Sequence, residues 1–545
     1  VIEKRTVFER GMSGGLDSGD FALRGGFARS FQRNGMSDFR ARFSNNPGLA
    51  FTAARNNNLP APNDLGALPL LLRDTARLTT PSFPEEPVFP NEGLVTNSIN
   101  ALDPNLQVPY SDSYTIGVQR GLTRNMAFEV RYVGTRSRQQ WTLYNYNEVN
   151  ILENGMLDEF RLAQANLQAN VAAGLGSQGF KYRGPGTGTV PLPNTFAYFQ
   201  TSGDPNNPAA YTSALFNNAT FVNPLATFNP NPFSFVDALD ADATRRANAL
   251  RNGLPANFLI ANPDKLGGAN VTGHGGFSNY NSVQFELRRR LAQGVQFNAS
   301  YVYGLGEGSA RYSFRVPRET VKSAGTTEGE VTHGFKINWM LDLPFGQGKR
   351  FLANAGPVLD RIIGGWQIHG NARVQSGIWV DFGNVRMVGF DEKGLRDMFK
   401  LRINENQRVF MLPQAVIDET VKAFSTDPRS ATGYGAQGPP SGKYFAPAMG
   451  PDCLETIAAG YGDCGTRTLA VRGPMFKEVD ISLMKTVPIV KRIRAEFRIE
   501  MLNAFNSVNY VPRASTSTNL ANHEVIGLTG LNTARVVQLV SRISW

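Results

Sequence analysis

Apolar and polar residues alternate along many short stretches of this chain, and period-two alternation is typical of β-strands with one apolar face. In one such stretch Phe128, Val130 and Tyr132 alternate with Glu129 and Arg131. The same pattern recurs in residues 283–288, 295–301, 335–342, 366–374, 479–483 and 493–500. The repetition predicts an all-β fold of antiparallel strands rather than one isolated hairpin.

The pattern predicts about eleven strands. They span residues 4–12, 20–33, 109–121, 125–148, 277–291, 295–305, 329–344, 361–383, 474–487, 492–504 and 534–545. Alternation alone does not separate a soluble β-sandwich from a membrane β-barrel, because both have one apolar and one polar face per strand.

The connections between the predicted strands separate these two classes. Turns of about three or four residues alternate with three long connections, residues 34–108, 149–276 and 384–473. Loops of that length are rare in soluble domains, whereas outer-membrane barrels combine short periplasmic turns with long extracellular loops. The sequence therefore predicts an antiparallel transmembrane β-barrel with long extracellular loops.

The long connections contain helical patterns of their own. Apolar residues recur at helical spacing within residues 154–174 and 413–424, where Gly174 suits a helix end and Pro413 a helix start. Residues 236–252 have Ala-rich and Arg-rich turns before Gly253. These patterns predict short helices packed within the extracellular loops.

The chain ends in an alternating segment that carries Val537, Leu539, Ile543 and a terminal Trp545. An aromatic residue at the end of a lipid-facing strand suits the aromatic girdle of a membrane barrel. The pattern also matches the signal by which barrel proteins are presented to the barrel-assembly machinery. An ordinary edge strand that happens to end in Trp is the alternative.

Composition and charge agree with a membrane-facing fold. Charged residues make up 18% of the 545 residues, and hydrophobic residues at 41% exclude a disordered chain. No run of about 18 apolar residues exists, which excludes a transmembrane helix. The net charge of +10 is scattered rather than clustered, so nucleic acid is not an expected partner.

The two cysteines, Cys453 and Cys464, lie in a Gly-rich stretch without a neighbouring histidine. This spacing favours a small disulfide in an oxidising compartment over a metal site, and two free thiols are the alternative.

Residues with catalytic or cofactor-binding chemistry do not cluster in the sequence. The four histidines are isolated, and no metal-binding, nucleotide-binding or nucleophile motif occurs, so we expect neither an enzyme nor a cofactor. The alternating charges Arg494, Glu496, Arg498 and Glu500 predict a lumen-facing charge ladder rather than a pair of catalytic carboxylates.

Several stretches resemble the barrel of TonB-dependent outer-membrane receptors of the Oar-like subgroup, whose members often carry a carboxypeptidase-regulatory-like domain. The matching stretches are PYSDSYTIGVQRGLTRNMAFEVRYVGTRSR (109–138), RGGFARSF (24–31), DEFRLAQANLQAN (158–170), LDLPFGQGKRF (341–351), IIGGWQIHG (362–370), LAVRGPMFKEVDISLMK (469–485) and EFRIEMLNAFNSVNY (496–510). The resemblance extends over nearly the whole chain, with the stretches in the expected order.

The resemblance implies a receptor of the Gram-negative outer membrane with 22 strands, a plug inside the barrel and an N-terminal box that contacts the TonB complex. Residues 1–545 would then form the C-terminal half of the barrel, without the plug or the box. An odd strand count agrees, because the first and last strands would both run towards the periplasm. The implied function is capture of an unknown extracellular ligand by the long loops, followed by TonB-coupled import past the plug.

Two other functions fit parts of the pattern. A surface adhesion or scaffold barrel would bind a partner with the same loops and transport nothing. A soluble secreted β-rich binding protein would show the same alternation without outer-membrane lipid as a partner.

Overall fold

A computed structural model describes residues 4–8, 21–33, 35–43, 46, 97–147, 151, 153–223, 239–240, 242–309, 322–323, 331–383, 385–447, 469–490, 493–510, 513, 515, 518–525 and 534–545. Within these residues thirteen strands share one sheet, called the main sheet below, and eleven of them follow one another along a single path. In order, these are β1 (Lys4–Phe8), β2 (Phe21–Phe31), β4 (Tyr110–Thr123), β5 (Met126–Asn145), β6 (Ala269–Ala292), β7 (Val295–Ser309), β9 (His333–Asp342), β10 (Trp366–Gln375), β17 (Phe476–Val490), β18 (Ile493–Leu502) and β19 (Val536–Ser544).

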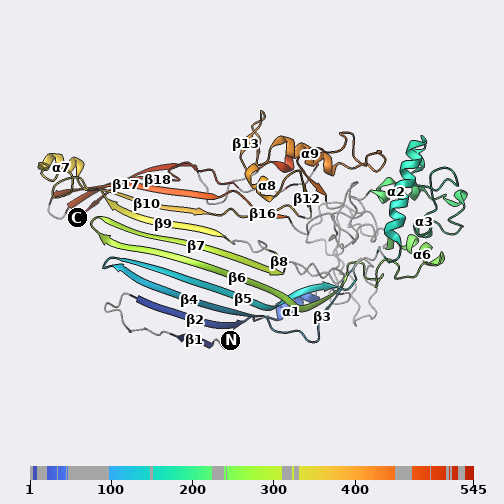
Figure 1. Ribbon diagram of the computed structural model, residues 1–545, viewed down its shortest axis with the longest axis horizontal. Helices are drawn as coiled ribbons and strands as arrows, with labels where there is room; N and C mark the ends of the chain where they lie inside the picture. Colours follow the sequence, from blue (N-terminus) through green and yellow to red (C-terminus); the bar gives the residue numbers. More distant parts are fainter. Residues whose placement is uncertain are drawn as a thin grey trace, which may run out of the picture.

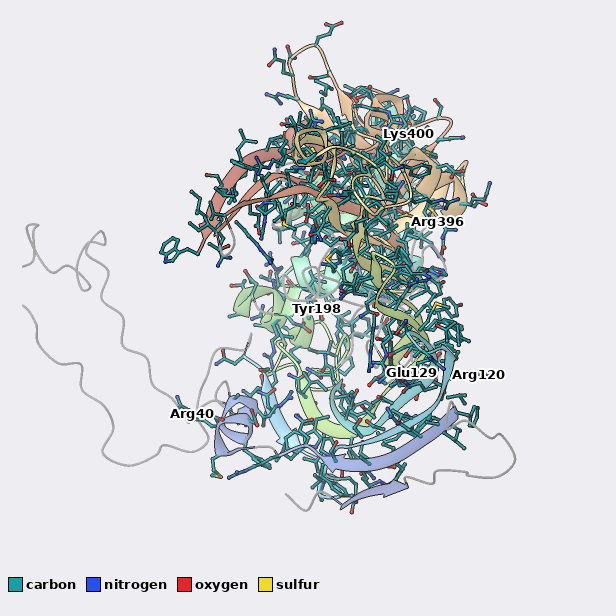
Figure 2. The ribbon with its side chains drawn as sticks, turned by 90° about the vertical axis from the view of Figure 1, so that its left-hand side faces the viewer. Arg40, Arg120, Glu129, Tyr198, Arg396 and Lys400 are labelled. Atoms are coloured by element: carbon teal, nitrogen blue, oxygen red, sulfur yellow. The ribbon has the colours of Figure 1, made fainter. Side chains whose placement is uncertain are left out.

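Every neighbouring pair along this path is antiparallel, and the path follows the order of the chain. The main sheet is therefore an up-and-down meander, as the alternating sequence pattern predicts. The strands lie side by side and form an open arc (Figures 1 and 2). In the described part of the chain β1 pairs only with β2 and β19 only with β18, so this arc has two edges.

The two ends of the strands differ. Tight turns join β4 to β5, β6 to β7 and β17 to β18 at the end where the C-terminus lies, and the long connections leave from the opposite end (Figure 1). The strand β6 has 24 residues, whereas about 9–11 residues are enough to cross a bilayer. The longest strands therefore continue past the thickness of a membrane towards the long connections.

Shorter strands flank the main sheet. The strand β3 (Ile99–Leu102) pairs in parallel with β6, and β8 (Lys322–Ser323) pairs with β7. Three two-stranded sheets pair β11 (Trp379–Asp381) with β16 (Ala470–Arg472), β12 (Val385–Val388) with β15 (Tyr444–Pro447), and β13 (Arg402–Ile403) with β14 (Val409–Phe410), as counted in the described ranges.

The helices lie mainly in the long connections. They are α1 (Met36–Phe43), α2 (Met156–Ala172), α3 (Pro193–Phe199), α6 (Ala243–Arg251), α7 (Pro357–Ile363), α8 (Glu392–Met398) and α9 (Gln414–Phe424), with 3₁₀ turns η2 (Gly176–Gln178), η3 (Pro208–Ala210), η4 (Ala214–Asn217), η5 (Ala219–Val222) and η7 (Leu520–His523). The helices α2, α6 and α9 fall within the three stretches that were predicted to be helical from the sequence. No helix in the described ranges is both long and apolar enough to cross a bilayer.

The hydrophobic cores lie in the connections and not in the main sheet. One buried apolar cluster fills the described residues between 147 and 268, called the first loop body; it includes Leu167, Phe180 and Phe216. Another fills residues 379–447 and 469–472 with Tyr510 and 518–525, called the second loop body. The largest fully buried side chains of the described chain all belong to one of these two bodies. The long connections are therefore packed structures.

Several strand boundaries differ from the sequence prediction. The predicted strand 361–383 ends at Gln375 as β10, and Trp379–Asp381 forms β11 in a separate sheet. Residues 361–363 were expected in a strand but belong to α7, because Pro357 begins a helix and Gly365, with φ of 68°, delays the strand to Trp366. The strand β6 begins at Ala269 rather than near 277. Glycines at its start permit close pairing, since a Cβ at Gly273 would lie 2.6 Å from the Tyr144 ring.

Aromatic rings also cover glycines within the main sheet. Trp339 of β9 lies opposite Gly370 of β10, and a Cβ at Gly370 would be 2.2 Å from the indole ring. The indole thus occupies the space that any side chain at position 370 would need. An aromatic ring packed over a glycine of the neighbouring strand helps to fix the register of a sheet.

We predict that Gly370→Ala destabilises the barrel by about 1–3 kcal/mol, the usual effect of overpacking. The matched control is Gly117→Ala, because the nearest atom to a Cβ at Gly117 lies 3.5 Å away, an ordinary contact. The measurement is the temperature at which the folded band is lost on heat-modifiable gels. Equal temperatures for the two variants would contradict the prediction.

Candidate functional site

The pairing register sorts the main sheet into two faces of opposite character. Residues directly opposite each other in neighbouring strands share a face, so Phe128, Phe285 and Phe335 lie on one face and Glu129, Glu286 and Lys336 on the other. These faces are called the apolar face and the polar face below. The large apolar residues that alternate in the sequence thus come together on one side of the sheet.

The apolar face exposes its side chains. Its exposed large hydrophobic residues are Phe21, Phe27, Phe31, Ile116, Val118, Phe285, Tyr303, Leu305, Phe335, Phe497, Ile499, Val537, Leu539 and Ile543. Phe497 is 52% exposed, and Phe128 and Trp339 of the same face are also accessible. An apolar surface of this extent, spread over one side of the arc, matches the lipid-facing band of a membrane barrel.

The polar face lies on the concave side of the arc. Figure 2 looks along the sheet from the C-terminal end and shows Glu129 on the inner side of the wall and Arg120, from the apolar face, on the outer side. In a barrel this concave surface lines the lumen. The charges that alternate with apolar residues in the sequence are therefore gathered along the inside.

Two cavities of the described structure lie along the concave surface. The larger, of about 660 Å³, lies at the turn end of the strands and is lined by Arg24, Arg124, Arg288 and Arg290, with Glu286 as the acidic member. The smaller, of about 360 Å³, is lined by polar residues of β7, β9 and β10. Asn298 lines both cavities, so they form one continuous surface. Its excess of arginine gives a positive potential that attracts anionic groups.

The predicted charge ladder lies on this polar face. Arg498 forms an ion pair with Glu496 and a second with Glu500, in which Nη1 and Oε1 are 3.7 Å apart. The register places Glu496 opposite Arg542 of β19, while Arg494 lies opposite Ser544 near the end of the strand. The structure brings Glu496, Arg498 and Glu500 into contact, and the lumen-facing role of all four residues stays a prediction.

The predicted assembly residues lie on the opposite face. Val537, Leu539 and Ile543 of β19 pair with residues of the apolar face of β18, and Leu539 is 77% exposed. Trp545 follows the strand and is 91% exposed. Their recognition by the assembly machinery remains a prediction. Cys453 and Cys464 lie outside the described residues, so their pairing also stays a prediction.

The four histidines are not brought together. His274, His333 and His369 lie on β6, β9 and β10, and His523 lies in η7. His333 Nδ1 is 2.7 Å from the Tyr301 hydroxyl. Within the described ranges no group of three His, Cys, Asp or Glu residues is placed to hold a metal ion.

Buried polar residues hold the first loop body in one conformation. The Glu159 carboxylate, 4% exposed, accepts backbone N–H groups of Asn194 and Thr195 at the start of α3, at 2.8 and 2.5 Å. Asp240 accepts the Tyr198 hydroxyl at 2.9 Å, while its other oxygen has no hydrogen-bond partner in the described structure. Burial raises the pKa of both carboxyl groups.

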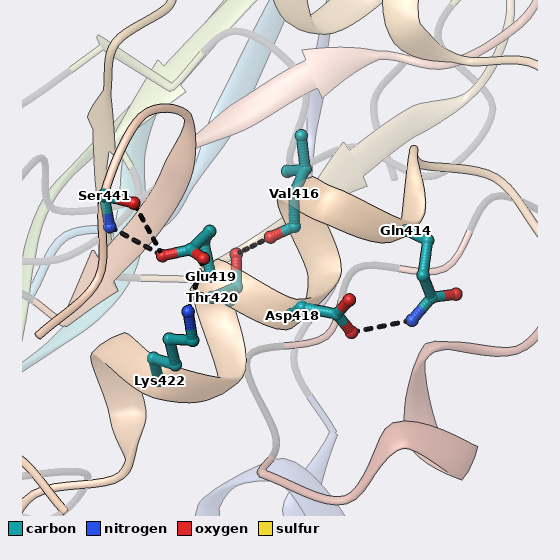
Figure 3. A network of polar contacts seen from close by, with 7 residues as sticks. All are labelled: Gln414, Val416, Asp418, Glu419, Thr420, Lys422 and Ser441. Atoms are coloured by element: carbon teal, nitrogen blue, oxygen red, sulfur yellow. Dashed lines mark hydrogen bonds and ion pairs between the residues drawn. The ribbon is translucent and has the colours of Figure 1, made fainter. Parts of the chain in front are cut away.

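The second loop body is tied together through α9 (Figure 3). The Glu419 carboxylate accepts the Ser441 backbone N–H at 2.6 Å and the Lys422 ammonium at 2.6 Å. The hydrogen bond from Lys422 lowers the pKa of Glu419. Thr420 accepts the Phe445 N–H of β15 at 3.1 Å. One side of α9 is thus fastened to the small sheet β12–β15.

The two loop bodies also touch each other. Gln168 of α2 donates to the carbonyl oxygens of Pro428 and Ser430, the latter at 2.9 Å. Arg429 donates to the Asn217 carbonyl oxygen at 3.3 Å. These contacts join segments more than 200 residues apart, and no local sequence pattern signals them. The loop bodies therefore meet at the end of the sheet opposite the tight turns.

The apolar outer face, the polar concave face and the packed loop bodies together define an outer-membrane β-barrel protein. The sequence profile described as an outer membrane beta barrel domain matches residues 11–538. The chain belongs to this family, which places it in the outer membrane of a Gram-negative bacterium. A comparison with curated protein sequences gives no match.

Similar solved structures include several outer-membrane receptors. They are the outer membrane transporter YddB from Escherichia coli (9% identity, TM-score 0.32, 96% of this chain and 38% of that chain), the ferripyoverdine receptor of the outer membrane of Pseudomonas aeruginosa (9%, 0.31, 97% and 31%) and the ferric-catecholate import receptor Fiu from E. coli K12 (7%, 0.31, 97% and 33%). The chain spans about a third of the length of each.

We predict that the first loop body loses stability as the pH rises. The folded pKa values of Glu159 and Asp240 lie above their ordinary values of 4.5 and 3.8, so the folded body binds these protons more tightly than the unfolded chain. The contribution of these two carboxyl groups to the stability of the first loop body is fully present below pH 3.8. It is lost progressively as the pH rises through the raised pKa values. The measurement is papain cleavage within residues 147–268 at pH 5 and pH 7.

Asp240→Asn keeps an oxygen that accepts the Tyr198 hydroxyl but cannot ionise. We expect this variant to show a smaller increase in cleavage between pH 5 and pH 7 than the parent. The matched control is Asp158→Asn, on the exposed side of α2, which should behave as the parent does. The same pH dependence in all three proteins would count against the assignment.

Proposed function

We propose that the protein is an outer-membrane receptor that captures a ligand with its loop bodies and imports it through the barrel. The observation that carries the proposal is the polar concave face, which continues through both cavities towards the turn end of the strands. A polar lining of this kind is compatible with the passage of a hydrated ligand. The arrangement supports binding and passage, and we propose no catalytic step.

The width of the sheet supports a lumen with room for a gate. Barrels of eight strands are filled by their own side chains, whereas larger barrels enclose a channel or a plug. The described path already has eleven strands, and both of its edges lack a second partner strand in the described part of the chain. We propose that further strands close the barrel, with this chain as the C-terminal half of a 22-stranded receptor of the Oar-like subgroup.

Energy coupling is the remaining part of the proposal. A plug inside the lumen, connected to the TonB complex, would release the ligand towards the periplasm. The arginine-rich cavity lies at the turn end of the strands, where an acidic surface of such a plug would find a complementary charge. The barrel-assembly machinery and outer-membrane lipid are the other proposed partners.

Energised uptake tests this function directly. Cells that produce the complete receptor and cells that lack it would be given radiolabelled ferric chelate, maltoheptaose or a tryptic peptide mixture at nanomolar concentration. We expect uptake of one of these probes only in the producing cells, and its loss when a protonophore collapses the inner-membrane proton gradient. Binding of the probe at 4 °C should persist under both conditions.

A surface scaffold gives a different result in the same assay. Probe binding that depends on the protein, without any uptake that the protonophore abolishes, would contradict import and leave adhesion as the function. Replacement of residues 153–262 by a short Gly-Ser linker provides the control, because it removes the first loop body and should abolish binding while the barrel still shows heat-modifiable mobility.

A further inference from the structure

The connection between β9 and β10 differs from the other turns at its end of the sheet. Residues 343–365 form a compact loop, in which Phe345 and Phe351 make an isolated parallel β-bridge, followed by the helix α7. Figure 1 shows α7 beside the C-terminus, at the end of the strands opposite the loop bodies. In a barrel with short periplasmic turns, this is the end next to the inner, phospholipid leaflet of the outer membrane.

The connection exposes an unusual amount of apolar surface. Its exposed large hydrophobic residues are Phe345, Phe351, Leu352, Val358, Leu359 and Ile362. On α7, Val358 and Ile362 are 75% and 63% exposed. At 100° per residue, Val358, Leu359 and Ile362 fall on one side of the helix, and Asp360 and Arg361 fall on the other. The helix is therefore amphipathic, with its apolar side uncovered by any described residue.

The compact loop and the helix are held to each other. Asp360 of α7 accepts the Gln347 backbone N–H at 2.5 Å, and the Phe345 and Phe351 ring centroids are 5.6 Å apart. The apolar residues of the two parts thus belong to one rigid unit and not to a loose loop. We call residues 343–365 the turn-end anchor.

A lysine shows on which side of the wall this anchor lies. Lys485 of β17 pairs in register with Trp366 and Phe497, so it belongs to the apolar face. An ammonium group is costly on a lipid-facing surface. Its Nζ donates to the carbonyl oxygens of Ile362 and Gly364 at the end of α7, and it lies 5.3 Å from the Trp366 ring centroid.

The contact of Lys485 places the end of α7 over the lipid side of the wall. The helix is thus continuous with the apolar face and does not lie below the lumen. The carbonyl groups at the C-terminal end of α7, which is the negative end of the helix dipole, accept hydrogen bonds from the Lys485 ammonium group.

The charge of the anchor complements an anionic lipid surface. Lys349, Arg350 and Arg361 are exposed, whereas the single acidic residue of the segment, Asp360, accepts the backbone N–H of Gln347 in the compact loop. Basic residues beside an exposed apolar helix face are the combination by which interfacial helices bind phospholipid.

We propose that the turn-end anchor lies in the headgroup region of the phospholipid leaflet, with Val358, Leu359 and Ile362 towards the acyl chains and the basic residues among the lipid phosphates. The anchor fixes the height of the barrel wall in the bilayer on the side of β9 and β10. This inference depends on the membrane location of the chain and not on whether the receptor imports a ligand.

Depth-dependent fluorescence quenching tests the anchor. The full receptor, with Cys453→Ser and Cys464→Ser, receives a single bimane-labelled cysteine at Val358, Ile362 or Arg361 and is reconstituted in phosphatidylethanolamine–phosphatidylglycerol vesicles. Lipid carrying a doxyl group at acyl carbon 5 should quench the probes at 358 and 362 about twofold more than the probe at 361, because interfacial helices insert their apolar face about 5–10 Å into this region.

The control position lies on the opposite side of the same helix, so it shares every other feature of the anchor. Leu359→Cys serves as a further apolar position if either variant fails to show heat-modifiable mobility. Equal quenching at 358, 361 and 362 would overturn the proposal. Probes at 358 and 362 that respond to the protein-to-lipid ratio and not to doxyl lipid would show that a second copy covers this face, which would also overturn it.

Discussion

The structure depends on the need of every backbone N–H and C=O group within lipid to find a partner in the protein. Along the described path of the main sheet, each of eleven antiparallel strands forms backbone hydrogen bonds with the strands next to it. The two edges β1 and β19 each have one neighbouring strand in the described part of the chain. Because an unpaired edge in hydrocarbon is costly, the arc is stable in a membrane only as part of a closed wall.

Much of the fold can be predicted from local sequence, because the alternation of apolar and polar residues identifies a strand even when its neighbouring strands are unknown. The faces of Phe128 and Glu129 were predictable from the period of two alone. The start of β6 was not, since Gly273 and Gly276 have no side chains to contribute to the pattern and are required by the approach of β5. Residues 361–363 were mistaken for a strand because the apolar residues Ile362 and Ile363 lie only two glycines before Trp366.

The candidate site was predictable only where it lies on one strand. Alternation placed Glu496 and Arg498 on a common face, and the structure shows their ion pair. The arginine-rich cavity draws Arg24, Arg124 and Arg288 from three separate parts of the sheet, so it depends on strand order and register. The contacts between the loop bodies depend on tertiary packing across more than 200 residues, which no single-sequence pattern encodes.

The buried cores of the loop bodies have an evolutionary consequence. Residues such as Phe216 and Phe445 pack among loop residues and leave the wall of the barrel untouched. Surface residues of these bodies can therefore be substituted without any change to the strands that cross the bilayer. The sequence of the loop surface is in this way free to vary separately from the sequence of the barrel wall.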